Sequence, residues 1–432
     1  MSKLQPYTTY QPVQYDYVSQ LPEGWQLLPN IAIFRERIER GFDNEELLSV
    51  TIGKGVIRQS DVDIKKDSSN EDKSKYKLIK VGDIAYNRMR MWQGALGYSD
   101  YQGITSPAYV VLKPKMEINQ RFFHYMFRTG FYTNYSKRFS YGIVDDQLSL
   151  RYVDFKRMYS IVPPLETQNA IVAYLDRKTQ QIQEFITKKE RLIELLEEER
   201  REYIDKVTHE LGSYKTYTKP LKYLIKFISE QTNKKEDDEQ YIALENIESW
   251  TGKLDLSIGD NVFESNVKKF RETDILFNKL RPYLAKVVIP EFKGVCVGEI
   301  LVLRPSKEII REYLFYTLIS RRFIDLVDSS TFGSKMPRAS WEFIGKVDIT
   351  YPIDHSEQNK ICKKIKNKEL SVSRLKSKYL FEIERIKEYH ESLITQVVTG
   401  QLKVPEKGNA NLEQNIELGM VAESNGVYHS KH

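Results

Sequence analysis

The sequence predicts an α+β protein built as an internal repeat, with two similar mixed α/β domains separated by two long coiled-coil helices. One observation is a repeated phrase: "GDIAYNRMR" at residues 82–90 returns as "TDILFNKLR" at residues 273–281. A second is that each copy continues into a long stretch with apolar residues at alternating steps of four and three. A third is that aromatic and β-branched segments, broken by Gly, Pro, Asn and Asp, precede each stretch, as in short strands separated by turns.

The repeat has a spacing of 191 residues, from position 82 to position 273. Three further landmarks recur in the same order at this spacing or one residue short of it: "VVLKP" (110–114) with "LVLRP" (301–305), Gly142 with Gly333, and Gln168 and Asn169 with Gln358 and Asn359. Four ordered landmarks indicate a tandem duplication. We therefore expect five segments: a first domain over 1–160, a helix over 161–211, a second domain over 212–351, a helix over 352–402, and a flexible tail over 403–432.

Each expected domain contains short strands and at least one helix. The strands are expected at "DIAYNRM", "AYVVLKP", "KVVIPEF" and "GEILVLRP", and the helices over residues 119–135 and 308–327. Two charged stretches, residues 65–77 and 229–240, are expected to be solvated loops.

The two long helices are expected over residues 165–211 and 354–399. In the first, the expected apolar seam begins at Ile171 and runs through Ile182, Phe185 and Leu192. A helix of about 40 residues is about 60 Å long at 1.5 Å per residue, so one neighbouring domain cannot cover it. The helices are therefore expected to pack against each other, and antiparallel pairing would relate the two domains by a pseudo-two-fold axis.

Composition excludes several classes of protein. The chain has 432 residues, and no apolar run approaches the ~20 residues that a membrane span needs. Its first residues, "MSKLQPYTTYQPVQY", lack the apolar core of a secretion signal, and its two cysteines show no metal-ligand or disulfide pattern. A cytoplasmic protein is expected. With 66 basic against 60 acidic residues and a net charge of +6, any surface that binds nucleic acid must be local.

No catalytic or metal-binding motif is found. "GKG" at 53–55 begins like a dinucleotide fingerprint, but Arg58 stands where the third glycine should be. The six histidines are scattered, and "DVDIKK" (61–66) is interpreted as a solvated charge run with no counterpart in the second copy. "VPPLE" (162–166) lacks the residues that amino-methyltransferases use to hold a flipped base. The sequence thus favours a non-catalytic protein.

The candidate binding residues follow the repeated phrase and a later loop in each copy. They combine basic, amide and aromatic side chains, which can contact phosphates, base edges and sugars of DNA. They are Arg88, Arg90, Trp92, Gln93, Tyr141 and Gln147 in the first copy, and Lys279, Arg281, Tyr283, Lys335 and Arg338 in the second. The alternative is that the phrase belongs to the scaffold. We favour this alternative for the shared Asp, Ile and Asn, with Asn87 and Asn278 holding a turn.

These features together resemble the DNA-specificity subunit of type I restriction–modification systems. The resemblance rests on the duplicated layout, "NRMRMWQGALG", "DILFNKLRPY", the helix starts "PPLETQNAIVAYLDRKTQQI" and "SEQNKICKKI", and the closing "LITQVVTGQLKV". One departure is "YPIDHSEQ", where the family has two prolines before the second helix.

The resemblance implies two target-recognition domains that each read half of a split site on double-stranded DNA. It further implies that the helices dock two methyltransferase subunits, which bind S-adenosylmethionine and methylate adenine, and that restriction and translocase subunits join them. The chain itself would hold no cofactor, while S-adenosylmethionine, ATP and Mg would belong to the partner subunits.

The leading hypothesis is therefore a DNA-recognition subunit with an asymmetric target, because the later loops differ ("GIVDDQ" against "GSKMPR"). A coiled-coil scaffold that joins two protein partners without touching DNA would explain the duplication and the helices equally well. A stand-alone methyltransferase or nuclease is a third alternative, but it needs a cofactor site that the sequence does not show.

Overall fold

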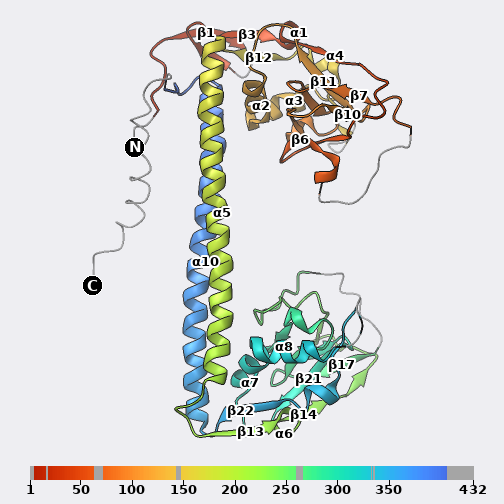
Figure 1. Cartoon of the computed structure of the whole chain (residues 1–432), viewed down its shortest axis with the longest axis vertical. Helices are drawn as coiled ribbons and strands as arrows, with labels where there is room; N and C mark the ends of the chain where they lie inside the picture. The colour runs from red at the N-terminus through yellow and green to blue at the C-terminus, as the bar shows by residue number, and fades with distance from the viewer. Residues whose placement is uncertain are drawn as a thin grey trace. The chain divides into compact units, whose positions relative to one another are not determined.

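The structure is a computed structural model that describes residues 4–15, 18–62, 72–142, 147–258, 266–331, 333 and 336–405 (Figure 1). It divides into two compact units. Unit 1 comprises Met1–Ile186 and Ile383–His432, and unit 2 comprises Thr187–Glu382. Each unit therefore combines one of the expected domains with part of both long helices.

Unit 1 is organised around a four-stranded antiparallel sheet in the order β4-β11-β8-β9. Its strands are β4 (Phe34–Glu36), β11 (Tyr109–Pro114), β8 (Ile84–Asn87) and β9 (Leu96–Tyr98). Four two-stranded pairs surround it: β1 (Tyr10–Tyr15) with β2 (Val18–Pro22), β3 (Gln26–Pro29) with β12 (Tyr159–Val162), β5 (Leu48–Thr51) with β6 (Gly55–Arg58), and β7 (Lys77–Ile79) with β10 (Gly103–Thr105).

Unit 2 repeats the central sheet in the order β14-β21-β18-β19. Its strands are β14 (Ile225–Ile228), β21 (Ile300–Pro305), β18 (Ile275–Asn278) and β19 (Val287–Val288). A second sheet has the order β15-β17-β20-β16, with β15 (Gln231–Thr232), β17 (Val267–Phe270), β20 (Gly294–Cys296) and β16 (Gln240–Ile242). The pair β13 (Thr216–Pro220) and β22 (Asp348–Pro352) matches β3 and β12.

The internal repeat that the sequence predicts is confirmed, because both central sheets have the same strand order and the same antiparallel pairing. The hydrogen bonds of a buried glutamine at the start of each long helix also recur. Buried Gln168 accepts a hydrogen bond from the Asn119 backbone N–H (2.9 Å), and buried Gln358 accepts one from the Ile310 N–H (2.7 Å). In both cases the other end of the amide donates to the carbonyl of a proline.

Each helix expected inside a domain is in fact two helices, so the expectation of one continuous helix is wrong. They are α2 (Gln120–Arg128) and α3 (Gly130–Arg138) in unit 1, and α7 (Arg311–Leu318) and α8 (Arg321–Ser329) in unit 2. The break falls at Thr129 and at Ser320, where the backbone is extended and the hydroxyl caps the following helix. Such a residue interrupts a helix without any change in the apolar pattern.

Short helices complete each unit. They are α1 (Asn30–Ile33), α4 (Tyr152–Phe155), α6 (Leu221–Leu224) and α9 (Trp341–Ile344), with 3-10 turns η1 (Gln59–Asp61), η2 (Met91–Gln93) and η4 (Pro282–Leu284).

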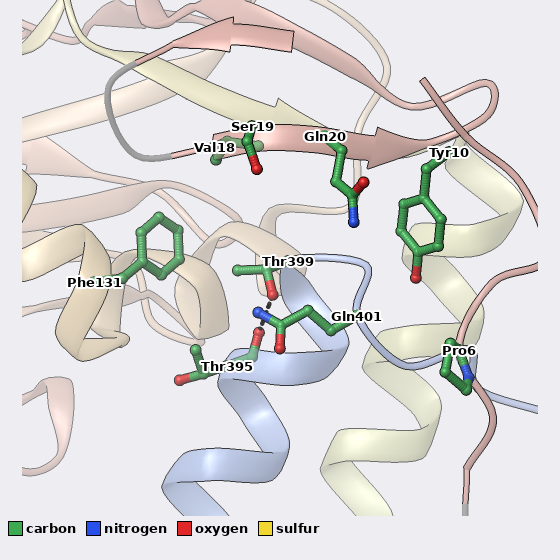
Figure 2. Close-up of a pocket in the computed structure, with 9 residues that line it drawn as sticks. All are labelled: Pro6, Tyr10, Val18, Ser19, Gln20, Phe131, Thr395, Thr399 and Gln401. Carbon is green, nitrogen blue, oxygen red and sulfur yellow. Dashed lines mark hydrogen bonds between the residues drawn. The ribbon is translucent and has the colours of Figure 1, made fainter. Parts of the chain in front are cut away.

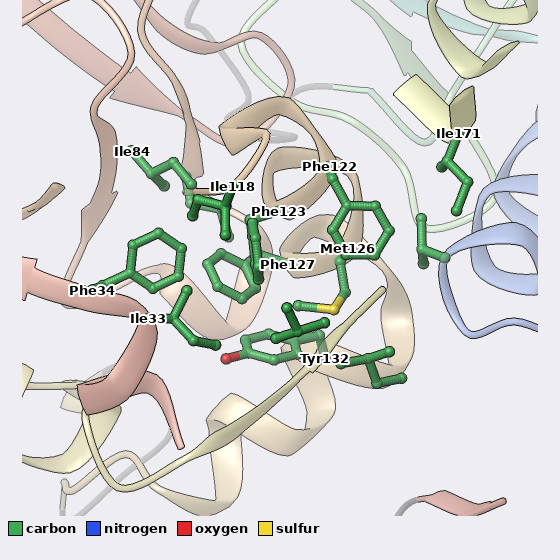
Figure 3. Close-up of a cluster of buried hydrophobic side chains, with 14 of the residues drawn as sticks. Ile33, Phe34, Ile84, Ile118, Phe122, Phe123, Met126, Phe127, Tyr132 and Ile171 are labelled. Atoms are coloured by element: carbon green, nitrogen blue, oxygen red, sulfur yellow. The ribbon is translucent and has the colours of Figure 1, made fainter. Parts of the chain in front are cut away.

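The main core of unit 1 lies between the central sheet and helices α2 and α3. Phe122, Phe123 and Phe127 of α2 are fully buried, and the Phe123 ring meets Phe34 of β4 edge-on with centroids 5.1 Å apart (Figure 3). Unit 2 has the equivalent cluster around Tyr313 and Phe323. Because the central sheet is held from this side in both units, the loops at its end have a rigid base.

The long helices are α5 (Leu165–His209) and α10 (His355–Val398), and they pair antiparallel within each unit. In unit 1, Thr179 and His390 share a hydrogen bond of 2.9 Å, and Leu175 packs in the same cluster as Leu393. In unit 2 the ion pairs run in opposite directions along the two helices: Lys189 with Glu382 (2.7 Å), Glu197 with Lys376 (2.9 Å), and Arg200 with Glu369 (3.1 Å). The expected antiparallel pairing is confirmed.

The buried seam of α5 departs from the expected positions after Ile182. Phe185 and Leu192 are 37% and 40% exposed, whereas Ile186 is only 6% exposed. Arg200, which the expected seam passes over, is buried and paired with Glu369. A second step of four residues therefore follows Ile182, and this leaves Phe185 and Leu192 outside the seam.

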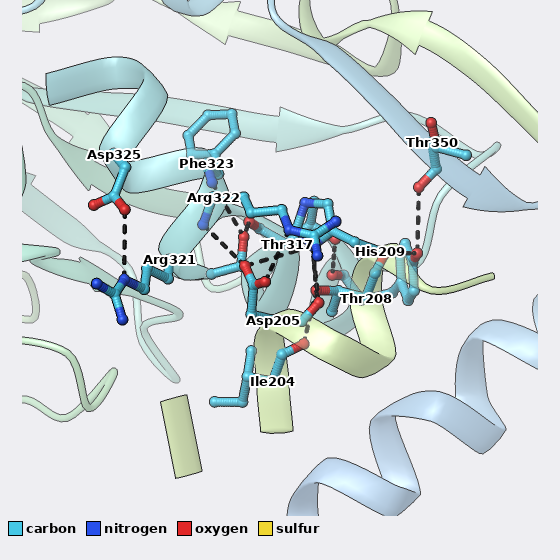
Figure 4. Close-up of polar contacts among 12 residues, drawn as sticks. Ile204, Asp205, Thr208, His209, Thr317, Arg321, Arg322, Phe323, Asp325 and Thr350 are labelled. Carbon is cyan, nitrogen blue, oxygen red and sulfur yellow. Dashed lines mark hydrogen bonds and ion pairs between the residues drawn. The ribbon is translucent and has the colours of Figure 1, made fainter. Parts of the chain in front are cut away.

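The end of each long helix packs against the second helix of a domain, but with different chemistry. In unit 2, Asp205 of α5 pairs with Arg322 of α8 at 3.0 Å and accepts a hydrogen bond from its backbone N–H (Figure 4). In unit 1, the corresponding place between α10 and α3 is a cavity of about 540 Å³ that is lined by Thr395, Thr399 and Phe131 among others (Figure 2).

Candidate nucleic-acid interface

In both units the repeated phrase covers the end of a central strand and the turn that follows it, and the turn is the same. The Asn87 side-chain oxygen accepts a hydrogen bond from the Met89 N–H, and the Asn278 oxygen accepts one from the Leu280 N–H, both at 3.0 Å. This is a turn that asparagine stabilises through its own side chain. The shared asparagines are therefore scaffold residues, as the sequence favoured.

The shared aspartates are scaffold residues too. Buried Asp83 accepts two hydrogen bonds from Arg37 (2.7 and 3.0 Å), and buried Asp274 accepts two from Arg304 (2.6 and 2.8 Å). The hydrogen bond that Arg37 donates to Asp83, together with the negative charge of that carboxylate, raises the pKa of Arg37 against the opposing effect of burial. The aspartate recurs, but its arginine comes from just after β4 in unit 1 and from β21 in unit 2. Both pairs are contacts within the scaffold.

In unit 1 the phrase and the later loop lie together. The backbone N–H of Leu150 donates to the carbonyl of Arg88 at 2.9 Å, and the Arg88 side chain donates to the carbonyl of Ala108 at 3.0 Å. Arg88 is thus partly committed to holding the loop before β11. Arg90 and Gln93 are exposed, and Arg90 forms no ion pair with any residue in the described part of unit 1.

The two candidate aromatic residues of unit 1 each lie beside a cation. The Trp92 indole N–H donates to the Met89 carbonyl (3.1 Å), and the Lys137 ammonium lies 4.9 Å from the centre of its ring. Tyr141 is 68% exposed, and Arg151 lies 5.7 Å from its ring centre. Both are cation–π arrangements, and the Arg151 guanidinium also donates to Asp154 at 3.0 Å.

The later loop of unit 1 is a small hairpin. Tyr141 and Ser149 exchange backbone hydrogen bonds of 3.1 and 2.9 Å. Gln147, near the end of this hairpin, is exposed. The residues 143–146 lie outside the described residues.

In unit 2 the phrase and the later loop are joined more tightly. The Ala339 N–H donates to the Lys279 carbonyl (3.0 Å), and the Arg281 N–H donates to the Pro337 carbonyl (2.8 Å). Arg338 therefore lies beside the phrase, and it precedes Ala339 as Ser149 precedes Leu150 in the first copy. Lys335 lies outside the described residues.

A glutamate that the sequence did not single out lies between two of the unit 2 candidates. Glu299, just before β21, pairs with Arg338 at 2.9 Å and with Lys279 at 3.8 Å. Sequence reasoning missed Glu299 because its partners are distant along the chain and its counterpart in the first copy is Ala108. Lys137 and Arg151 were missed for the same reason: their aromatic partners are found only in the folded chain.

The remaining candidates of unit 2 lie on a strained turn. Arg281 has φ 50°, and Ala285 has φ 45° where the first copy has Gly94 at φ 84°. Left-handed backbone at residues other than glycine is costly and concentrates at functional sites. Tyr283, between them, is 45% exposed. Lys286 is turned inward and donates to the Leu244 carbonyl at 2.6 Å.

Other features of the described residues offer no competing chemistry. No group of three or more His, Cys, Asp or Glu residues there could hold a metal ion, and no described helix could cross a membrane. Burial raises the pKa of the Cys296 and Cys362 thiols to about 12, so neither is a thiolate near neutral pH. The nine residues that line the cavity of unit 1 are all uncharged, which does not suit a phosphate (Figure 2).

Comparison with known proteins identifies relatives of one kind. Residues 215–385 match the family model of the type I restriction modification DNA specificity domain. The type I restriction enzyme EcoDI specificity subunit of Escherichia coli is 23% identical over 164 residues, which are 38% of this chain and 36% of that protein. The match therefore spans about a third of that relative's length.

Two solved structures share the fold across most of the chain. A chain from a structure of complex assembly and conformational transition in a type I R-M system aligns with a TM-score of 0.66 and 16% identity, covering 89% of this chain and 100% of that chain. The HsdS subunit of Thermoanaerobacter tengcongensis aligns with a TM-score of 0.51 and 17% identity, covering 88% and 98%. The resemblance that the sequence predicted and the mixed α/β fold with two long helices are confirmed.

Proposed function

We propose that this chain, a homologue of type I restriction–modification specificity subunits, binds double-stranded DNA and that each of its two α/β copies reads one half of a bipartite target. The proposal is supported by the loops at the end of the central sheet. In both units two loops, which follow β8 or β18 and precede α4 or α9, meet there and present basic and aromatic side chains. Lysine and arginine neutralise phosphates, and arginine and amide side chains recognise base edges.

The two halves of the target are expected to differ. The loops at the end of the sheet contain Gln147 and Trp92 in unit 1, and Arg338 and Tyr283 in unit 2. Glutamine forms paired hydrogen bonds with adenine and arginine with guanine, so a shared half-site sequence would not suit both copies.

The test is a chimera in which residues 20–160 are replaced by those of a relative with a known target. The readout is the sequence of methylated sites in host DNA, mapped by single-molecule sequencing. Modular reading requires that one half-site changes and the other stays. If both changed, or neither, the assignment of one half-site to each copy would be wrong.

The long helices are the proposed docking surface for two methyltransferase subunits. In unit 2 the helices expose six large apolar side chains, at least 37% each: Leu192, Leu195, Leu370, Leu375, Leu380 and Phe381. Exposed apolar groups on two paired helices support a surface that a protein partner covers. S-adenosylmethionine, ATP and Mg would then be bound by the methyltransferase and the restriction and translocase subunits, and adenine methylation would take place on the methyltransferase.

Docking can be tested by replacing Leu380 and Phe381 together with aspartate. Burying each of these side chains contributes about 1.5–3 kcal/mol, so affinity for the methyltransferase subunit should fall at least about tenfold. Ser377→Asp, an exposed polar position on the same helix, is the matched control. Equal affinity of the double variant and the control would remove this part of the proposal.

A scaffold that joins two proteins without binding DNA is the competing function, and the same exposed apolar residues would serve it. Titration of labelled duplex DNA against the chain with the methyltransferase subunit separates the two. Binding that weakens steeply with salt supports DNA recognition. A complex that forms with the protein partner and ignores DNA would support the scaffold.

A further inference from the structure

The two copies differ in the charge that lies behind their recognition loops. At the position before β11 the first copy has Ala108, and at the equivalent position before β21 the second has Glu299. In unit 1 the side chain of Arg88 reaches only a backbone carbonyl at this place. In unit 2 a carboxylate takes that place and contacts both Lys279 and Arg338.

The backbone that carries Glu299 is firmly fixed. Buried Lys268 donates to the carbonyls of Gly298 and Ile300, both at 2.8 Å, and the Lys279 N–H donates to the carbonyl of Glu299 itself at 3.2 Å. Lys77 makes the equivalent contact in unit 1, donating to the Tyr109 carbonyl at 2.8 Å. Since both neighbours of Glu299 are pinned, its backbone is held in one place, and the contact with Arg338 orients its carboxylate.

The carboxylate is only partly satisfied. One oxygen, Oε1, lies 2.9 Å from the Arg338 guanidinium. The other, Oε2, is buried, lies 3.8 Å from the Lys279 ammonium, and has no hydrogen-bond partner among the described residues. This oxygen therefore faces the Lys279 ammonium without a hydrogen bond to it.

The guanidinium that Glu299 holds remains available. The Arg338 side chain is 55% exposed, and its contact with Glu299 uses Nη2. A guanidinium carries five donors in a rigid planar fork, so one edge can be held by a carboxylate while another meets a base. Holding the fork in one orientation favours a paired contact over a loose contact with any phosphate.

We propose that Glu299 is a positioning residue for DNA recognition by the second copy. It orients the Arg338 guanidinium toward a base, and its negative charge weakens the attraction of Arg338 and Lys279 to phosphates. Binding to non-target DNA is thereby suppressed. The inference rests on the proposed function and adds to it a source of selectivity. It follows that the second copy relies on an aimed base contact, whereas in the first copy Ala108 at this position places no carboxylate beside Arg88.

The test is Glu299→Gln in the full chain bound to its methyltransferase subunits, because glutamine keeps the size and an acceptor but removes the charge. The matched control is Glu308→Gln. Glu308 lies beyond the other end of β21 and is also ion-paired, with Lys219 at 2.5 Å. Affinities are measured by titration for the duplex defined by methylation mapping and for a scrambled duplex, over a series of salt concentrations.

Glu299→Gln should bind the scrambled duplex about five- to tenfold more tightly at low salt, and its target-to-scrambled ratio should fall by a similar factor. Without the charge of Glu299, Arg338 and Lys279 can both contact phosphates of the scrambled duplex. The slope of log K against log salt for that duplex should therefore become steeper by about 1–2, because each phosphate contact contributes about 0.9. Glu308→Gln should match the unchanged chain. A purely structural role would instead weaken both duplexes without changing the slope.

The outcomes separate the two proposals. If the unchanged chain does not discriminate between the duplexes, the proposed function fails and this inference with it. If it discriminates while Glu299→Gln behaves as Glu308→Gln does, or weakens both duplexes at a constant slope, only this inference is overturned. Should Glu299→Gln fail to fold, Ala108→Glu provides the reverse test: it should weaken scrambled binding and flatten the slope, and no change would overturn the inference.

Discussion

A buried histidine in unit 1 predicts how the stability of the chain depends on pH. His124 lies on α2, and its Nδ1 accepts a hydrogen bond from the Tyr98 N–H at 3.1 Å. Burial, and then the charges of Arg128 and Arg121, lower the pKa of His124 from 6.5 to about 3. A protonated ring would also lose the acceptor that the Tyr98 N–H needs. The native state therefore holds this ring neutral.

The magnitude follows from proton linkage. Below pH 6.5 the unfolded chain binds a proton at this histidine and the native chain does not, so the stabilisation is complete above pH 6.5 and is lost as the pH falls toward 3. Between pH 7.5 and pH 5.5 the free energy of unfolding should fall by about 1.4 kcal/mol through this residue alone, the value of RT ln 10 that results from RT ln(1 + 10) at pH 5.5 less RT ln(1 + 0.1) at pH 7.5.

The measurement compares the unchanged chain with His124→Asn, whose side-chain oxygen can accept the same hydrogen bond but does not titrate. Urea unfolding of both proteins is followed at pH 7.5 and at pH 5.5. Other titrating groups are the same in both, so the difference between the two pH effects isolates His124. If the free energy of unfolding of His124→Asn fell as much between pH 7.5 and pH 5.5 as that of the unchanged chain, the His124 ring would not be held neutral by its surroundings. That result would refute the prediction.

Three further predictions concern single positions. Tyr86→Phe should raise the free energy of unfolding by about 1 kcal/mol, because the buried Tyr86 hydroxyl has no hydrogen-bond partner among the described residues and the second copy already has Phe277 at this position; a loss of stability on denaturant unfolding would contradict it. Gly94→Ala should lower that free energy by about 1 kcal/mol, since φ is 84° and the added carbon meets no atom closer than 3.9 Å, which leaves only backbone strain; a loss above about 3 kcal/mol would show a steric clash instead. Arg338→Ala should relax recognition in one half-site by about 1–3 kcal/mol, measured by competition between duplexes with single base changes; an equal loss for every duplex would make Arg338 a phosphate contact.

The duplication made most of the fold predictable, because a match at constant spacing implies that both copies form the same elements. The two long helices followed from periodicity in the same way. The errors came from local events that leave the apolar pattern intact. Thr129 caps a new helix where the sequence continues a helical pattern, and one extra step of four residues after Ile182 leaves Phe185 exposed. Neither the cap nor the extra step alters the number or kind of apolar residues from which the helices were predicted.

The candidate site was predictable only in its outline. The spacing of the repeat located the loops. Backbone hydrogen bonds join the two loops of each unit, between Arg88 and Leu150 and between Lys279 and Ala339, as the hypothesis requires. Which side chains restrain one another could not be predicted. Glu299 and Arg338 are 39 residues apart in the chain (338 − 299), and nothing in either stretch reports on the other.

The pattern of change between the copies supports recognition of two different sequences. Asp83, Asn87 and Gln168 recur as Asp274, Asn278 and Gln358, and each makes hydrogen bonds that a substitution would leave unmatched in a buried or half-buried place, at a cost of about 1–3 kcal/mol per group. Substitution of exposed side chains usually changes stability by less than about 0.5 kcal/mol. The exposed positions at the end of the sheet were thus free to diverge. They did so in the side chains that can distinguish bases, so one scaffold can carry two specificities.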